Sequence, residues 1–151
     1  MTEAQTSLDT IATLDRLITL LQLEPQGPDH FRGASEDIGT SRVFGGQVLG
    51  QALVAACRTA TSPIHSLHAY FLLPGDHHQP IDYLVERVRD GRSFATRRVV
   101  AQQKGRTIFT MMASFHAPEA GSFSHQRQMP AVPPPEGLQT ETALRQAQAD
   151  Q

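Results

Sequence analysis

The residues best suited to chemistry in this chain are Gly45, Gly46 and Gln47, which begin an uncharged segment running from 44 to 57. The first backbone N–H groups of a helix have no partner within it, and glycines leave those groups uncovered. Such donors can stabilise the negative oxygen that develops when an acyl group is attacked. The same glycines also suit a purely steric role, in which Phe44 turns sharply and the helix approaches a neighbouring backbone closely. Both interpretations stay open on the sequence alone.

A second set of chemically capable residues surrounds the turn at 90–93. Arg89, Arg92 and Arg97 lie within nine positions of one another. Guanidinium groups are strong charged donors to phosphate, so an anionic ligand at this end of a hairpin is one prediction. Solvated charges at an ordinary surface turn are the alternative.

Histidines offer weaker signals for catalysis or metal binding. His65 and His68 are three residues apart in a predicted strand, which points them to opposite faces unless a bulge intervenes. His77 and His78 follow Asp76 in a loop, but this set lacks the four ligands of a structural zinc site. We therefore predict no metal site, and no cofactor motif is present. Cys57, on an apolar helix, is a poor nucleophile because burial raises a thiol pKa.

The elements that must position these residues follow from periodicity. Apolar residues recur at helical spacing through the glycine-rich segment, at Leu49, Leu53, Ala56 and Cys57, so we predict a helix that is surrounded. Four extended segments follow in succession, with glycine in each connection. Their ranges are 64–73, 81–89, 93–103 and 106–116. An antiparallel sheet wrapped around the helix, an α+β architecture, accounts for both features.

The rest of the chain divides simply. An amphipathic helix over 8–23, with its stripe at Leu8, Ile11, Leu14, Ile18 and Leu21, should lie on a surface. A short strand is expected over 31–35. We predict one domain over 1–118 and a proline-rich linker or tail over 119–151 whose last residues, from 140 on, are frayed or disordered.

Bulk properties narrow the class of partner. The net charge is −2 and no basic stripe is present, which argues against nucleic acid. No run of about 18 apolar residues and no signal-peptide pattern is found, so we expect no membrane span. A single cysteine excludes an intrachain disulfide and favours a reducing compartment, the cytoplasm.

At this point a resemblance becomes specific. The chain resembles the acyl-CoA thioesterase II (TesB) family over about residues 14–140, with the motifs in the same order and spacing. The motifs are Phe31-Arg32-Gly33 with Ser35-Glu36-Asp37, Val43-Phe44-Gly45-Gly46-Gln47-Val48 with Gly50-Gln51-Ala52, His65-Ser66-Leu67-His68-Ala69-Tyr70-Phe71 with Pro74-Gly75-Asp76, Arg89-Asp90-Gly91-Arg92-Ser93-Phe94 with Arg97, and Ile108-Phe109 with Ala113-Ser114-Phe115. The resemblance implies a hotdog fold, in which a long central helix is wrapped by an antiparallel β-sheet.

The resemblance also implies a function, hydrolysis of acyl-CoA by activated water. It makes His65 a candidate catalytic group, whereas a local role at the start of its strand is the alternative. It makes Gly45, Gly46 and Gln47 candidate donors to the thioester, and Arg89, Arg92 and Arg97 candidate ligands of the CoA phosphates. In the family an Asp, a Ser or Thr, and a Gln that activate water lie in a second hotdog domain, which this sequence does not contain.

The sequence leaves two functions open. The chain is the N-terminal domain of an acyl-CoA thioesterase, or it is a non-catalytic acyl-binding domain that completes the sheet of a catalytic partner. Either way, a lone hotdog sheet leaves an unpaired edge, so we expect a homo-oligomer or association with a second hotdog domain.

Overall fold

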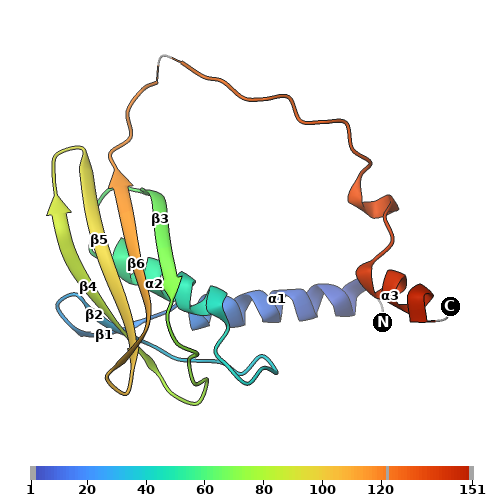
Figure 1. Ribbon diagram of the computed structural model, residues 1–151, viewed down its shortest axis with the longest axis horizontal. Coiled ribbons are helices and arrows are strands. Elements are labelled where there is room, and N and C mark those ends of the chain that lie inside the picture. Colours follow the sequence, from blue (N-terminus) through green and yellow to red (C-terminus); the bar gives the residue numbers. More distant parts are fainter. Residues whose placement is uncertain (1–2, 122, 150–151) are drawn as a thin grey trace. The chain divides into compact units, whose positions relative to one another are not determined.

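The computed structural model describes the backbone of residues 3–121 and 123–149, and the side chains of 12–121 and 123–149. The chain forms two compact units, Met1–Glu119 and Ala120–Gln151. In the first unit, helix α2 (Gly45–Cys57) packs against strands β2 to β6 of a six-stranded antiparallel sheet (Figure 1). The strands are β1 (Glu24–Gly27), β2 (His30–Gly33), β3 (Ile64–Phe71), β4 (Ile81–Asp90), β5 (Phe94–Gln103) and β6 (Arg106–His116). The α+β prediction is confirmed.

The order of strands differs from a simple meander. Strands β4, β5 and β6 are hairpin neighbours, but β3 pairs with β6 at one edge, giving the order β1-β2-β4-β5-β6-β3. The connection over 72–80 is therefore a crossing loop and not a hairpin. Leu72 and Leu73 both donate their N–H groups to Ile108 O, which turns the chain away from β3. The glycine in this loop, Gly75, packs against Val43 instead of forming a tight turn.

Alternation along the strands fixes which side of the sheet faces α2. In β6, Phe109, Met111, Ala113 and Phe115 are almost fully buried, as the sequence predicts. Neighbouring strands place buried residues beside them, Tyr83 and Val99 among others. The strand β3, although in register with this face, remains exposed at Leu67 and Phe71 because it is the edge strand.

The prediction that α2 is surrounded is wrong. Its buried residues lie on one side of the helix and include Val48, Ala52 and Ala55. Leu49 and Leu53 are only half-buried, and Cys57 is exposed at the end of the helix. Partial burial still raises the pKa of the Cys57 thiol, so it remains a poor nucleophile. The sheet covers one side of α2 and leaves an apolar side open.

The remaining elements differ from expectation at their ends. Helix α1 spans Glu3–Leu20, so it begins and ends earlier than predicted, and Leu8 and Ile11 lie outside the described side chains. The expected short strand is β2, and β1 precedes it in a hairpin. In the second unit a 3-10 turn, η1 (Pro135–Gly137), precedes helix α3 (Glu141–Ala149), which buries no residue.

No helix in the described parts of the chain is both long and apolar enough to cross a membrane.

Candidate functional site

The first turn of α2 opens into a cavity. Phe44 precedes the helix in an extended conformation and provides no side-chain cap. Gln47 N and Val48 N both donate to Phe44 O, whereas the N–H groups of Gly45 and Gly46 have no acceptor within the described residues. A cavity of about 310 Å³ lies beside Gly45. The free N–H of Gly45, at the positive end of the helix dipole, therefore lies at a hollow that can accept an oxygen carrying negative charge, and the free N–H of Gly46 follows it in the same turn.

Both glycines also lie close to aromatic rings. A Cβ at Gly45 would lie 3.1 Å from the Phe71 ring, and a Cβ at Gly46 would lie 2.5 Å from the Phe44 ring. The two interpretations of the glycines are thus compatible, because the N–H groups are free and each glycine lies against a ring.

Two residues that line this cavity were not identified from the sequence. Arg42 and Phe71 both contact it. Among the described residues Arg42 has no ion-pair partner. Its position three residues before the first helical glycine was the available signal, since a cation beside a free helix N-terminus adds to the attraction for an anion.

The side chain of Gln47 is engaged within the protein. Its amide nitrogen donates to Ala34 O over 3.0 Å, and its oxygen accepts from Glu36 N over 3.4 Å. One turn on, Gln51 donates to Leu20 O and Ala34 O and accepts from the Tyr83 hydroxyl over 2.7 Å. Burial raises the Tyr83 pKa, so this hydroxyl stays a donor. These glutamines join α2 to the ends of α1 and β2.

His65 lies on the face of the sheet opposite to α2. Its Nε2 is 2.9 Å from Ser114 Oγ, and its ring meets the rings of Phe94 and His116 edge-on, each with centroids 5.9 Å apart. The structure therefore separates His65 from the free N–H groups of α2 and gives it local partners.

The expectation that His65 and His68 point to opposite faces is wrong. The register of β3 against β6 shifts between Ile64 and Ser66, and this bulge turns His65 to the face on which His68 meets Tyr70. No group of three or more potential metal ligands is found among the described residues. In the loop at 76–78 the Asp76 carboxylate stabilises the turn, because it accepts a hydrogen bond from His78 N over 2.9 Å.

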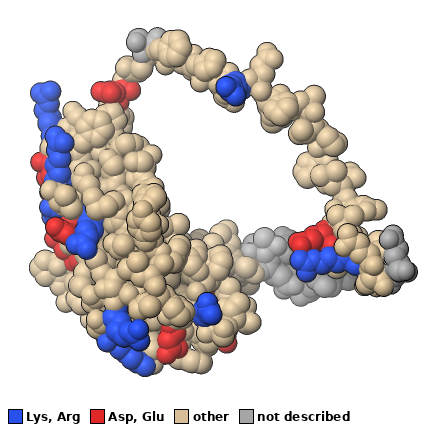
Figure 2. All heavy atoms as spheres, in the orientation of Figure 1, with Lys and Arg blue, Asp and Glu red and all other residues tan. Residues whose placement is uncertain are grey.

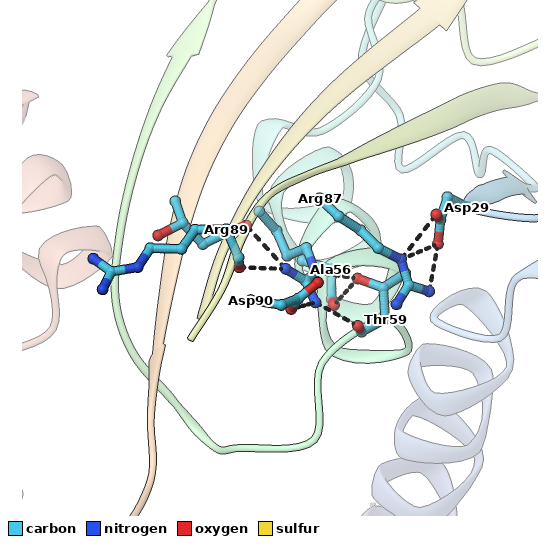
Figure 3. A network of polar contacts seen from close by, with 8 residues as sticks. Asp29, Ala56, Thr59, Arg87, Arg89 and Asp90 are labelled. Atoms are coloured by element: carbon cyan, nitrogen blue, oxygen red, sulfur yellow. Dashed lines mark hydrogen bonds and ion pairs between the residues drawn. The ribbon is translucent and has the colours of Figure 1, made fainter. Parts of the chain in front are cut away.

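The three predicted phosphate ligands lie toward the other end of the sheet, near the 90–94 hairpin. Arg97 is 1% exposed, and its five N–H groups are all used. They donate to Thr59 Oγ1, Thr59 O, Arg89 O, Thr96 O and Asp90 Oδ1. Figure 3 shows Ala56, Thr59, Arg89 and Asp90 in this network at the C-terminal end of α2. Arg97 thus has a structural role, with no donor left for a ligand.

Charge is distributed over both ends of the sheet. Arg89 and Arg92 are exposed at the hairpin, whereas Lys104 and Arg106 lie at the opposite end, beside a smaller cavity that adjoins the first. Figure 2 shows basic side chains at both ends of the face in view, mixed with acidic ones. Two carboxyl groups have pKa values below the ordinary range because an arginine donates hydrogen bonds to each of them. Arg87 donates to Asp29 (Figure 3), and Arg32 donates to Asp82.

The sequence is similar to that of known acyl-CoA thioesterases. Residues 32–116 match the family model described as "Acyl-CoA thioesterase N-terminal domain". Human "Acyl-coenzyme A thioesterase 8" is 48% identical over 122 residues, which are 80% of this chain and 38% of that protein. "Acyl-CoA thioesterase 2" of Haemophilus influenzae is 48% identical over 88% of this chain and 47% of its own length. The chain thus spans less than half the length of these relatives.

Solved structures confirm the hotdog fold. "Acyl-CoA thioesterase II TesB2" of Mycobacterium marinum superposes with a TM-score of 0.71 and 48% identity, over 80% of this chain and 45% of that one. A protein "with Hot dog Fold" from Alicyclobacillus acidocaldarius has a TM-score of 0.72 at 23% identity, over 80% of this chain and 47% of that one. At that identity the second likeness concerns the fold alone.

Proposed function

This chain belongs to the acyl-CoA thioesterase family, of which it forms the N-terminal domain, and from that premise we propose that it takes part in hydrolysing acyl-CoA. In this reaction the oxygen of water attacks the thioester carbonyl and the carbon–sulfur bond breaks. The products are a carboxylic acid and the thiol of coenzyme A. The observation that carries the proposal is the pair of free N–H groups at Gly45 and Gly46, in a helix turn where Gly45 lines one cavity and Gly46 lines another.

The contribution of this chain is to hold the reacting carbonyl. The N–H groups of Gly45 and Gly46 donate to its oxygen, and the donors become more effective as the oxygen gains charge in the transition state. Phe71 packs against Gly45 and would lie beside the bound carbonyl. Arg42, on the cavity wall, suits the anionic part of coenzyme A better than the distant Arg97 does.

Activation of the water falls to another domain. The lining of the cavity contains no carboxylate and no imidazole within the described residues. The family resemblance assigns this task to an Asp, a Ser or Thr, and a Gln of a second hotdog domain. His65, on the opposite face of the sheet and bonded to Ser114, has a role in strand packing in this proposal.

The second hotdog domain joins at the β3 edge. This strand has a partner on one side only, and its residues Leu67 and Phe71 expose apolar surface on the α2 side. The uncovered side of α2, with Leu49 and Leu53, offers further apolar surface. Edge pairing would continue the sheet and bury this surface. The partner is a second copy of this chain or another hotdog domain.

We place the protein in the cytoplasm, because its single cysteine is an unpaired thiol.

The alternative is a domain that binds the acyl group without catalysing its hydrolysis. This role predicts binding of acyl-CoA with no turnover even when the second domain is present. Release of coenzyme A, followed with a thiol-trapping dye, separates the two functions.

Substitution of Gly45 by proline tests the donor role directly. Proline is tolerated at the first position of a helix, and Phe44 already has the extended conformation, ψ 127°, that a following proline requires. Gly45→Pro removes one donor, whereas Gly45→Ala adds the same Cβ and keeps the N–H, and so serves as its control. With a second hotdog domain present in the assay, we expect kcat of the proline variant to fall by about 10²- to 10³-fold relative to the alanine variant. Equal rates for the two variants would refute the donor role, and a loss of turnover in His65→Ala would move the site to the opposite face.

A further inference from the structure

A second and larger cavity lies on the other side of the first turn of α2. It has a volume of about 460 Å³ and lies between the last turns of α1 and the first two turns of α2. Leu17, Leu20 and Leu21 line it on the α1 side, and Ile38 and Phe44 line it on the other. We refer to it as the α1 groove.

The floor of the α1 groove is bare helix backbone. Gly46 and Gly50, one turn apart, both line it. A Cβ at Gly50 would lie 3.0 Å from Leu21 Cδ2. Side chains at these two positions would occupy the space between α1 and α2, so the two glycines keep the groove open along the axis of α2.

The side-chain polar groups of Gln47, Arg16 and Glu36 at the α1 groove already have partners. The Gln47 amide is bonded to Ala34 O and Glu36 N, and Arg16 forms an ion pair with Glu36 at the rim. A buried water molecule normally needs two to four polar partners, which the groove walls do not offer. The groove is therefore suited to an apolar occupant.

The α1 groove and the donor site meet at one turn of helix. Gly45 lines the cavity of about 310 Å³, and Gly46 lines the α1 groove. Phe44, which is 56% exposed, lies against Gly46 on the wall of the α1 groove. A carbonyl bound to the N–H groups of Gly45 and Gly46 therefore has a hollow on each side.

We propose that the α1 groove receives the linear acyl chain of the substrate, while the coenzyme A portion extends through the cavity beside Gly45 and Arg42. This inference rests on the proposed function and deepens it by assigning the selection of acyl chain length to α1. Allowing about 30 Å³ for each methylene-sized group, as for water in the liquid, the α1 groove of about 460 Å³ has room for at most about fifteen such groups, enough for a ten-carbon chain. Leu17, one of the lining residues, limits the length of acyl chain that the groove admits.

Paired substitutions on α1 test this assignment. Leu17 and Ile18 are each 50% exposed, but only Leu17 lines the groove. Leu17→Phe therefore fills the groove, and Ile18→Phe adds a ring of the same size to the adjacent surface. The probes are decyl-CoA and ethyl-CoA thioethers, which cannot be hydrolysed, titrated into the full chain by calorimetry.

We expect Leu17→Phe to weaken binding of the decyl thioether by about tenfold or more, since each excluded methylene costs about fourfold. Binding of the ethyl thioether should change less than about twofold, and Ile18→Phe should leave both unchanged. Equal effects of the two variants, or a wild-type chain that binds decyl-CoA no more tightly than ethyl-CoA, would overturn the inference.

Titration with free decanoate and free coenzyme A separates this inference from the proposed function. If decanoate binds in a manner sensitive to Leu17→Phe while neither thioether nor coenzyme A binds, the α1 groove is an alkyl site and the thioesterase role fails. If both thioethers bind equally and independently of Leu17, the coenzyme A site stands and the α1 groove assignment fails. If no probe binds, both fail.

Discussion

Replacing Arg97 by methionine distinguishes a structural arginine from a ligand-binding one. Arg97 is 1% exposed and connects the β4–β5 hairpin to the C-terminal end of α2. Thr59 Oγ1, one of its acceptors, itself donates to Ala56 O over 2.8 Å, so the network reaches the last turn of the helix (Figure 3). Methionine matches the length of the aliphatic stem but removes all five donors.

The expected cost follows from the acceptors that lose their partners. Thr59 O and Arg89 O accept from the guanidinium over 2.8 and 2.9 Å, the first in a buried bond and the second in a part-buried one, and a buried acceptor left unsatisfied costs about 1–3 kcal/mol. The lost bond to Asp90 contributes less, because that carboxylate is 58% exposed and regains water. We expect Arg97→Met to lower the free energy of unfolding by about 3–5 kcal/mol. For a domain of this size that corresponds to a fall in Tm of about 10–20 °C.

Thermal and urea unfolding, followed by circular dichroism, measure this loss. Arg97→Lys keeps the charge with fewer donors and should fall between methionine and wild type. Arg92→Met, at the exposed hairpin, should change the free energy of unfolding by less than about 0.5 kcal/mol. A stable Arg97→Met protein with a raised KM for acyl-CoA would refute the structural role and restore Arg97 as a substrate ligand.

Three further predictions concern stability. Gly33→Ala should destabilise the protein by about 1–3 kcal/mol in urea, because the new Cβ would lie 2.6 Å from Gln51 Oε1 in a side chain held by three hydrogen bonds. Tyr83→Phe should cost about 1–3 kcal/mol in the same assay, since Gln51 Oε1 loses its donor, and an unchanged midpoint would argue against this bond. The Asp82 pKa is lowered in the fold, chiefly by the Arg32 hydrogen bond. The ionised Asp82 therefore stabilises the folded protein above the unfolded pKa of about 3.9, and this stabilisation is lost as the pH falls through the folded pKa. Arg32→Gln should therefore flatten the decline of Tm between about pH 5 and 2, and a parallel decline would contradict the linkage.

The local sequence pattern was sufficient to predict the main helix and strands and one part of the site, the first turn of α2. Glycines and apolar spacing identified α2 and its free first turn, and strict alternation in β6 identified the buried face correctly. Both properties depend on neighbours along the chain, through helix geometry and the two-residue repeat of a strand. The hotdog family could also be identified from short motifs.

Long-range pairing decided what the sequence left open. The position of β3 beside β6 leaves an apolar edge, and a one-residue bulge before Ser66 turns His65 away from α2. Whether an arginine is buried depends on which acceptors surround it, so Arg97 and Arg92 looked alike in sequence and differ completely in the fold. The α1 groove likewise exists only because α1 packs against glycines about thirty residues away. The sequence by itself determined the helices and strands and the free first turn of α2, because local sterics govern both. The sheet edges, the burial of individual side chains and the cavities arise from contacts between distant segments, so the tertiary structure alone decided them.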